Sequence, residues 1–306
     1  MRPLVLLGLV AAALGACVPA DEAVGLGSVQ FTFTVSTQTR EGVDPTGTFD
    51  GWSVRFDRIV LGFKTMTVGE IGVADVCSYR GRGADADVIF DPRAGLVQTF
   101  NGIQPVTCPD VGIIFGPPDN ATTPGNGVTS RELVELASGS PAHAIVEATA
   151  ERERLIGGSP NVTTLRILLR FDSLRTSTRF GGCREATRGV RILEGRRDEV
   201  SVRFAAEHLF RNAISPTAKL RVDPFAESDR DGNGIVTMAE LDDLPLPFVA
   251  GMFGDFYQLP DGTRNGSFAD YIRALFRFTV MFRTEDGLCV GNEPGSEEGG
   301  QPAASP

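Results

Sequence analysis

The chain has 306 residues, of which 42% are hydrophobic, and it carries a formal net charge of −10. This much apolar material can bury a substantial core in one large or two small domains, so we do not expect a disordered chain. The negative charge argues against a nucleic-acid binder and against a protein that adheres to anionic lipids.

The first residues have the features of an export signal. Arg2 precedes an apolar run over residues 4–14, and residues 14–17 are Leu-Gly-Ala-Cys. A charged start, a short apolar segment and small residues before a cleavage position are typical of a signal peptide, and the run is too short to span a membrane. Residues 14–17 resemble the lipobox of bacterial lipoproteins. The resemblance implies cleavage after residue 16 and a lipid on Cys17, whereas an ordinary signal peptide with a chance cysteine is the alternative.

A lipid on Cys17 would hold the mature protein in the cell envelope, because two or more acyl chains anchor a protein stably. In the lipoprotein family, an aspartate after the lipidated cysteine favours the inner membrane. Val18 follows here, which favours the outer membrane. Residues 17–27 are then expected to form a short tether. No other apolar run approaches the roughly 18 residues of a spanning helix.

The part of the chain after the tether is predicted to form short strands. Residues 29–35 alternate apolar and polar side chains with a period of two, which predicts a half-buried strand. Residues 54–68 are predicted as one long bent strand or two. Shorter candidate strands follow at 73–77, 88–91, 96–100 and 111–115. A loop at 117–127 and one or two helical turns at 131–137 come next.

Two further strand pairs are predicted in the second half. Residues 143–151 and 163–171 flank a segment rich in Gly, Pro and Asn, which predicts a hairpin with a wide turn. Residues 189–193 and 199–204 repeat this arrangement. Many short strands without strand–helix alternation favour an antiparallel β-sandwich, which we expect over residues 28–290.

Four cysteines remain besides Cys17, and they are Cys77, Cys108, Cys183 and Cys289. An even number in an oxidising compartment predicts two disulfides. Three pairings are possible, and nearness along the chain favours Cys77 with Cys108 and Cys183 with Cys289. Zinc is the alternative, but no C-x-x-C spacing occurs and the chain has only two histidines.

Candidate catalytic residues are scarce. His143 lies in a predicted strand, and we interpret Glu207 and His208 as a polar pair at a sheet edge. No G-x-S-x-G or H-E-x-x-H motif occurs. Paired carboxylates of a glycoside hydrolase would leave no local motif, because their separation is a property of the fold. Trp52, the sole tryptophan, either packs in the core or offers a stacking platform for a sugar.

Residues 229–240 carry the clearest chemical signal in the chain. Side chains with oxygen atoms occupy positions 1, 3, 5, 9 and 12, and Gly234 occupies position 6. Calcium takes roughly six to eight oxygen ligands at about 2.3 to 2.6 Å, and the chain must turn sharply around it. The match to the pattern D-x-[DN]-x-[DN]-G-x5-E is complete, and a surface turn rich in Asp and Gly is the alternative.

These twelve residues resemble the calcium loop of the EF-hand family. The resemblance implies that Asp229, Asp231 and Asn233 bind through side-chain oxygens and that Ile235 binds through its backbone carbonyl. Thr237 would bind directly or through water, and Glu240 would bind with both carboxylate oxygens. Val236 would occupy the apolar eighth position.

Prolines around the loop limit its flanking helices. Pro216 and Pro224 leave room upstream for a short helix at 225–228, and the helix that opens at Thr237 must end before Pro245. No second loop of this pattern occurs in the sequence. Sensor EF-hands open a groove between long helices, so we expect a structural calcium site in an insertion at about 217–248.

The end of the chain is predicted to contain the longest helix. Ser267 and Asp270 match a capping box, and residues 268, 272, 275 and 276 lie on one helical face. A last strand is expected at 278–282. Residues 291–306 contain no large apolar residue, so we expect a disordered tail.

These features together predict a calcium-binding, lipid-anchored protein of the cell envelope, whose β-sandwich binds a protein or glycan partner. An envelope glycan hydrolase is the alternative, and a calcium sensor or scavenger is the second. The scarcity of catalytic motifs favours a binding protein over an enzyme.

Overall fold

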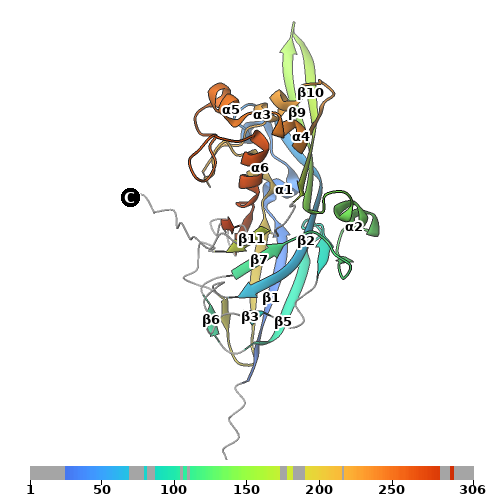
Figure 1. Cartoon of the computed structure of the whole chain (residues 1–306), viewed down its shortest axis with the longest axis vertical. Coiled ribbons are helices and arrows are strands. Elements are labelled where there is room, and N and C mark those ends of the chain that lie inside the picture. Colours follow the sequence, from blue (N-terminus) through green and yellow to red (C-terminus); the bar gives the residue numbers. More distant parts are fainter. Residues whose placement is uncertain are drawn as a thin grey trace, which may run out of the picture.

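The computed structural model describes residues 25–68, 79–80, 87–103, 106–108, 111–172, 178–181, 190–215, 217–282 and 290–292. Within these ranges the protein is mainly β, with two large sheets, one two-stranded sheet and six α-helices (Figure 1). The prediction of a mainly β fold with few helices is confirmed. Most strand pairs are antiparallel, and three are parallel.

The smaller sheet has the order β15-β13-β1-β5. Its strands are β1 (Gly27–Val35), β5 (Leu96–Ile103), β13 (Arg197–Phe204) and β15 (Val280–Phe282). Every second residue of β1 is buried, as its predicted alternation requires when one sheet face packs on a core. β1 pairs in parallel with β13 and antiparallel with β5.

The larger sheet has the main order β14-β10-β9-β2-β7-β11-β16, with β3 and β4 added to β2 and β8 added to β4. Its strands are β2 (Ser53–Val68), β3 (Tyr79–Arg80), β4 (Val88–Phe90), β7 (Val111–Phe115), β8 (Thr123–Pro124), β9 (Ala142–Ile156), β10 (Ser159–Asp172), β11 (Thr178–Gly181), β14 (Ile235–Thr237) and β16 (Val290–Asn292). Of the two predicted alternatives for residues 54–68, the structure has one long strand, and β2 shifts register against both β9 and β7.

The two large sheets share one hydrophobic core, which makes the fold a sandwich. Phe33 of β1 lies 5.1 Å from Phe63 of β2 and 5.4 Å from Phe90 of β4, measured between ring centroids. A smaller apolar cluster, which includes Leu136 and Ile145, lies on the opposite face of the larger sheet under helix α2 (Ser130–Ala137). The larger sheet is therefore covered on both faces along part of its length.

Two predicted hairpins differ in the structure. β9 and β10 do form a hairpin, but it closes in the tight turn Gly157-Gly158, with φ values of 60° and 85°, and not in a wide turn. β12 (Val190–Ile192) and β13 do not pair with each other as predicted. β12 pairs with β6 (Val106–Cys108), and β13 pairs with β1 and β15. Periodicity identifies a strand, whereas contacts between distant segments decide its partner.

The other helices are short. They are α1 (Thr37–Glu41), α3 (Asp223–Ser228), α4 (Met238–Asp242), α5 (Leu246–Phe253) and α6 (Phe268–Phe276), with 3-10 turns η1 (Pro45–Gly47) and η2 (Ala206–Phe210). α6 is the longest described helix and begins with the predicted capping box of Ser267 and Asp270. α5 was not predicted. Pro247 stands in its first turn, where a missing N–H is tolerated.

Several predictions concern residues outside the described ranges. These are the signal peptide, the lipidated Cys17, the strand at 73–77, and Cys77, Cys183 and Cys289, while only the backbone of Cys108 is described. β16 extends two residues into the segment expected as a tail. Among the described residues, no helix has both the length and the apolar character needed to cross a membrane.

Candidate calcium site

The predicted calcium loop joins α3 to α4 and is attached to the edge of the larger sheet. β14 forms inside the loop and pairs in parallel with β10, beginning at Ile235 opposite Arg166. The backbone N–H of Arg166 donates to the carbonyl of Gly234 at 2.8 Å. Val236, the apolar eighth position, is fully buried in the main core. The sandwich therefore holds the second half of the loop in place.

Three predicted ligands lie close together, two from the first half of the loop and one from its last position. Asp229, Asp231 and Glu240 each offer one carboxylate oxygen, and these atoms lie within 4.8 Å of one another. Gly232 and Gly234 adopt φ values of 68° and 74°, in the left-handed region that favours glycine. The two glycines allow the chain to reverse direction so that the carboxylates face one another.

Backbone hydrogen bonds hold the first carboxylates in position. Asp229 accepts hydrogen bonds from the N–H groups of Asn233 and Gly234, at 3.1 and 3.0 Å. Asp231 accepts from the Asn233 N–H at 3.0 Å and from its side-chain amide at 2.8 Å. The Oδ1 atom of Asn233 accepts from the N–H of Ile235 at 2.6 Å. The oxygen of Asn233 thus supports the turn.

The last two predicted ligands also begin α4. Glu240 Oε2 accepts from the backbone N–H of Thr237 at 2.8 Å and from its hydroxyl at 2.9 Å. The N–H of Glu240 donates to Thr237 Oγ1 at 3.4 Å, which completes a capping box. If both oxygens of Glu240 bind the ion, Oε2 contacts the ion and also accepts the hydrogen bonds of the helix cap.

The donor set suits calcium. The side chains that converge are the carboxylates of Asp229, Asp231 and Glu240, which offer oxygen atoms alone. The oxygen of Asn233 accepts a hydrogen bond from the N–H of Ile235. Calcium prefers hard oxygen ligands, whereas zinc and copper prefer nitrogen and sulfur ligands. Arg230 directs its guanidinium to the carbonyl of Asp243 at 2.9 Å, at the end of α4. A cation would offset the repulsion between the three converging carboxylates.

The helix that leads into the loop is anchored by a polar group that the sequence did not reveal. Asp50 Oδ2 accepts from the N–H groups of Val222 and Asp223, at 2.7 and 2.6 Å, at the start of α3. Asp223 Oδ1 accepts from Trp52 Nε1 at 2.9 Å and from Arg152 at 2.5 Å. Burial raises the pKa of Asp50. Both carboxylates hold α3 against the sandwich.

Trp52 belongs to this anchor and not to a sugar platform. Its side chain is fully buried, and the guanidinium of Arg152 lies 4.4 Å from the ring centroid. The alternative that placed a sugar on Trp52 is therefore wrong, because the ring has no exposed face. The core interpretation is confirmed.

The helix that leaves the loop is anchored to α6. Asp242 accepts from Arg273 at 2.9 Å and from the Ser267 hydroxyl at 2.9 Å. Burial raises the pKa of Asp242, but hydrogen bonds from Arg273 and Ser267 outweigh it and lower the pKa below its ordinary value. Leu241 is fully buried in the main core. Polar and apolar contacts thus fix both flanking helices.

Glu207 and His208 lie in the interior, so the prediction of a polar pair at a sheet edge is wrong. Glu207 is 4% exposed, and its Oε2 accepts from the hydroxyls of Ser36 and Thr39 at 2.7 and 2.5 Å. His208 Nδ1 lies 2.7 Å from the carbonyl of Phe278, and Nε2 lies 2.7 Å from Arg211. Burial raises the pKa of Glu207, and burial lowers the pKa of His208 to about 4.

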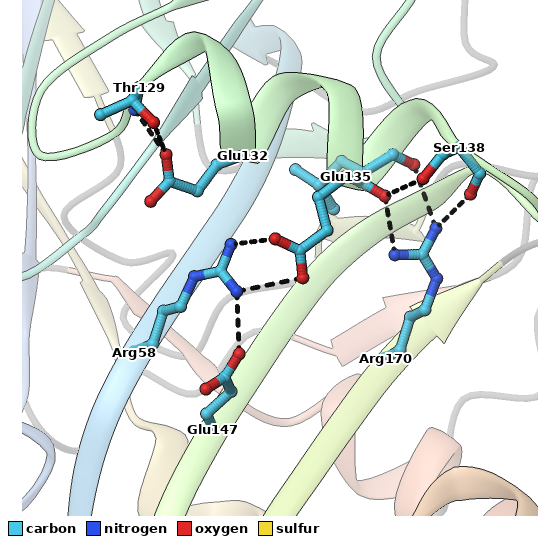
Figure 2. A network of polar contacts seen from close by, with 8 residues as sticks. Arg58, Thr129, Glu132, Glu135, Ser138, Glu147 and Arg170 are labelled. Atoms are coloured by element: carbon cyan, nitrogen blue, oxygen red, sulfur yellow. Dashed lines mark hydrogen bonds and ion pairs between the residues drawn. The ribbon is translucent and has the colours of Figure 1, made fainter.

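Helix α2 is held to the outer face of the larger sheet by two arginines (Figure 2). Arg58 of β2 forms ion pairs with Glu135 of α2 at 2.7 Å and with Glu147 of β9 at 2.8 Å. Arg170 of β10 donates to carbonyls at the end of α2, including that of Ser138 at 2.9 Å. A cation favours that end of a helix. Arg170 therefore has a structural role at the end of α2.

No family model matches the chain, and no curated protein or solved structure matches it. The functional assignment therefore depends on the residues of the chain itself.

Proposed function

We propose that the protein is a lipid-anchored protein of the cell envelope whose β-sandwich binds a protein or glycan partner and is stabilised by a structural calcium ion at residues 229–240. One observation carries the calcium assignment. Carboxylate oxygens of Asp229, Asp231 and Glu240 lie within 4.8 Å of one another in a loop whose ligand spacing matches a known calcium pattern.

The attachment of the loop supports a structural role over a sensor. The flanking helices α3 and α4 have six and five residues, and both are fixed to the sandwich or to α6. A sensor must have a second arrangement that calcium favours. A loop with a strand in the larger sheet and two anchored helices provides little freedom for such a change.

The expected stabilisation is modest. With a dissociation constant of about 0.1 mM and external calcium of about 1 mM, binding stabilises the folded protein by about 1.4 kcal/mol. For a domain of this size, that corresponds to a rise in melting temperature of about 3 °C.

Thermal unfolding with calcium and with a chelator tests the site. Calcium should raise the melting temperature of the full chain, and Glu240→Gln should remove most of this rise because it deletes a charge and keeps an acceptor for the helix cap. Asp229→Ala should have the same effect. Asp243→Ala is the control, since it deletes an exposed carboxylate beside the loop and outside the ligand pattern. An equal rise in wild type and Glu240→Gln would place the ion elsewhere.

A separate experiment tests the anchor. Cys17→Ala should move the protein from the membrane fraction to the soluble fraction, because Cys17 would carry the lipid. Retention of Cys17→Ala in the membrane fraction would contradict lipid anchoring and would leave the calcium result unaffected.

A further inference from the structure

One end of the molecule carries an exposed apolar surface that the calcium site does not use. Figure 1 shows α5 at the end opposite to the start of β1. Four exposed side chains on and around α5 form what we call the apolar platform: Phe49 (57% exposed), Phe248 (46%), Met252 (50%) and Phe256 (60%). Among the phenylalanines whose exposure the structure describes, these three are the only exposed ones. Aromatic residues and methionine are enriched where proteins bind one another.

Helix α5 is apolar on its outer side as well as on its inner side. None of its eight residues has a polar side chain. Leu246, Val249 and Ala250 are buried against the core, whereas Phe248 and Met252, four residues apart, lie together on the exposed side. A surface helix normally carries polar residues on its outer side, and a helix that is apolar all round is normally covered. The composition of α5 therefore indicates a partner on its outer face.

The contacts of Arg221 join the platform into one surface. Its guanidinium lies 4.4 Å from the ring centroid of Phe49 and 5.8 Å from that of Phe253, the last residue of α5. Arg221 also donates to the carbonyl of Phe253 at 2.6 Å. The ring of Phe256 lies so close to Gly254 that a side-chain carbon added there would meet it at 3.2 Å. Phe49 and Phe256 therefore both lie beside the C-terminal end of α5.

Two cations border the platform without a carboxylate partner. Lys219 Nζ lies 4.8 Å from the ring centroid of Phe49, and Arg221 contacts the same ring. Among the described residues, neither cation forms an ion pair. The acids next to platform residues in the chain have other partners, since Asp255 pairs with an arginine at 3.1 Å and Asp50 caps α3. This edge of the platform is therefore positive, although the whole chain has a net charge of −10.

The charges and the composition distinguish between possible occupants. Two copies of the chain repel each other through their net charge, and the same repulsion disfavours an anionic membrane. Under the proposed function the lipid anchor leaves the body at the start of β1, so α5 points away from the membrane. A glycan needs hydrogen-bonding groups, which the side chains of α5 lack. A protein segment with both apolar and acidic side chains complements the platform and its positive edge.

We propose that the apolar platform binds an acidic segment of a partner protein. Apolar side chains of the segment cover Phe248, Met252 and Phe256, and its carboxylates pair with Lys219 and Arg221. Arg221 is already held by the rings and by a backbone carbonyl, so it loses little freedom on binding. This inference rests on the proposed function, because it takes the binding role as given and selects a protein over a glycan.

Binding of two synthetic peptides to the full chain tests the inference by fluorescence anisotropy. The peptides share the same leucines and carry either Glu or Gln at the positions between them. The Glu peptide should bind about tenfold more tightly, because its carboxylates pair with the two cations. The net negative charge of the chain works against this preference, so the preference requires a local positive surface. Equal binding of the two peptides, or binding of neither, would overturn the inference.

Variants locate the binding surface. Phe248→Ser combined with Met252→Ser removes exposed apolar surface and should weaken binding of the Glu peptide at least about tenfold. Lys219→Glu should abolish the preference for the Glu peptide. Val134→Ser and Arg131→Glu are the matched controls, because they change an exposed apolar residue and an exposed cation on α2, and they should leave binding unchanged. Melting temperatures close to that of the wild type show that the variants fold.

Other results would assign the platform to a different occupant. Peptide binding unaffected by Phe248→Ser with Met252→Ser would overturn the inference. Binding to vesicles of phosphatidylcholine and phosphatidylglycerol that this double variant abolishes would also overturn it, in favour of a membrane. Self-association abolished by the same variant would overturn it in favour of a second copy. The calcium and Cys17 tests of the proposed function use other residues, so each can fail independently of this one.

Discussion

The calcium loop at 229–240 and the buried Glu207 both place carboxylates where a negative charge is unfavourable. The protein stabilises the carboxylates differently at the two places. In the loop, three carboxylates converge near the surface within 4.8 Å, and an external cation would offset their repulsion. Glu207 lies in the interior, where Ser36 and Thr39 donate hydrogen bonds to it. The loop is built from neighbours in the chain, whereas Glu207 meets residues 168 and 171 positions away. Hence the loop is visible in the sequence and the Glu207 site is not.

The largest loss of stability is expected at Glu207, which lies in the interior. Glu207→Ala removes the acceptor of the Thr39 hydroxyl and one of two acceptors of the Ser36 hydroxyl, and it opens a cavity. The free energy of unfolding should therefore fall by about 4 kcal/mol. Urea denaturation measures the change. Glu227→Ala, at an exposed carboxylate of α3, should alter the free energy by less than about 0.5 kcal/mol. Equal effects of the two variants would contradict the role assigned to Glu207.

The second largest effect on stability is expected from acid, through the buried His208. His208 has its pKa lowered to about 4 by burial, so its contribution to stability is complete above the unfolded value of 6.5 and is lost as the pH falls toward 4. The full loss is about 3 kcal/mol. His208→Asn should therefore flatten the decline of stability between these pH values, measured by urea denaturation at each pH.

Glu207 should oppose this acid effect. Its pKa is raised by burial, so its contribution is complete below the unfolded value of 4.5 and is lost as the pH rises through the folded value. Glu207→Gln removes that titration and should make the acid decline steeper. A slope unchanged by both Glu207→Gln and His208→Asn would show that other groups control the acid response.

A smaller effect should link the α3 anchor to the calcium loop. Asp223→Asn weakens the contacts with Trp52 and Arg152 and should lower the free energy of unfolding by about 2 kcal/mol. Calcium affinity should fall as well, because α3 enters the loop directly. Calorimetric titration of Asp223→Asn against wild type measures the affinity. An unchanged affinity would mean that the loop organises itself independently of the sandwich.

The smallest expected effect is at the helix cap within the loop. Thr237→Val removes the hydroxyl that accepts from the Glu240 N–H, so the free energy of unfolding should fall by about 1 kcal/mol. The same loss is expected with and without calcium, since this hydrogen bond joins the Thr237 hydroxyl to the backbone N–H of Glu240 and does not involve its carboxylate. A loss confined to the calcium-bound protein would assign the Thr237 hydroxyl to the ion in preference to the cap. Thermal unfolding in calcium and in chelator distinguishes the two results.

Much of the fold could be predicted from local pattern. The alternation of residues 29–35, the capping box at Ser267 and the prolines around α4 all mark elements that the structure contains. Their signals are local because side-chain period, helix caps and proline geometry act within a few residues. The tight turn at Gly157-Gly158 and the helix begun by Pro247 were missed, since the same residues also suit wider loops and helix ends.

The sequence by itself determined the mainly β character of the described fold, the short helices and the spacing of the ligand residues in the calcium loop. The tertiary structure decided that β13 pairs with β1, that Trp52 joins Asp223 and that Glu207 is buried. Each of these depends on segments far apart in the chain. Local propensity does not specify which distant surfaces meet, because that choice follows from burial and hydrogen bonding over the whole fold.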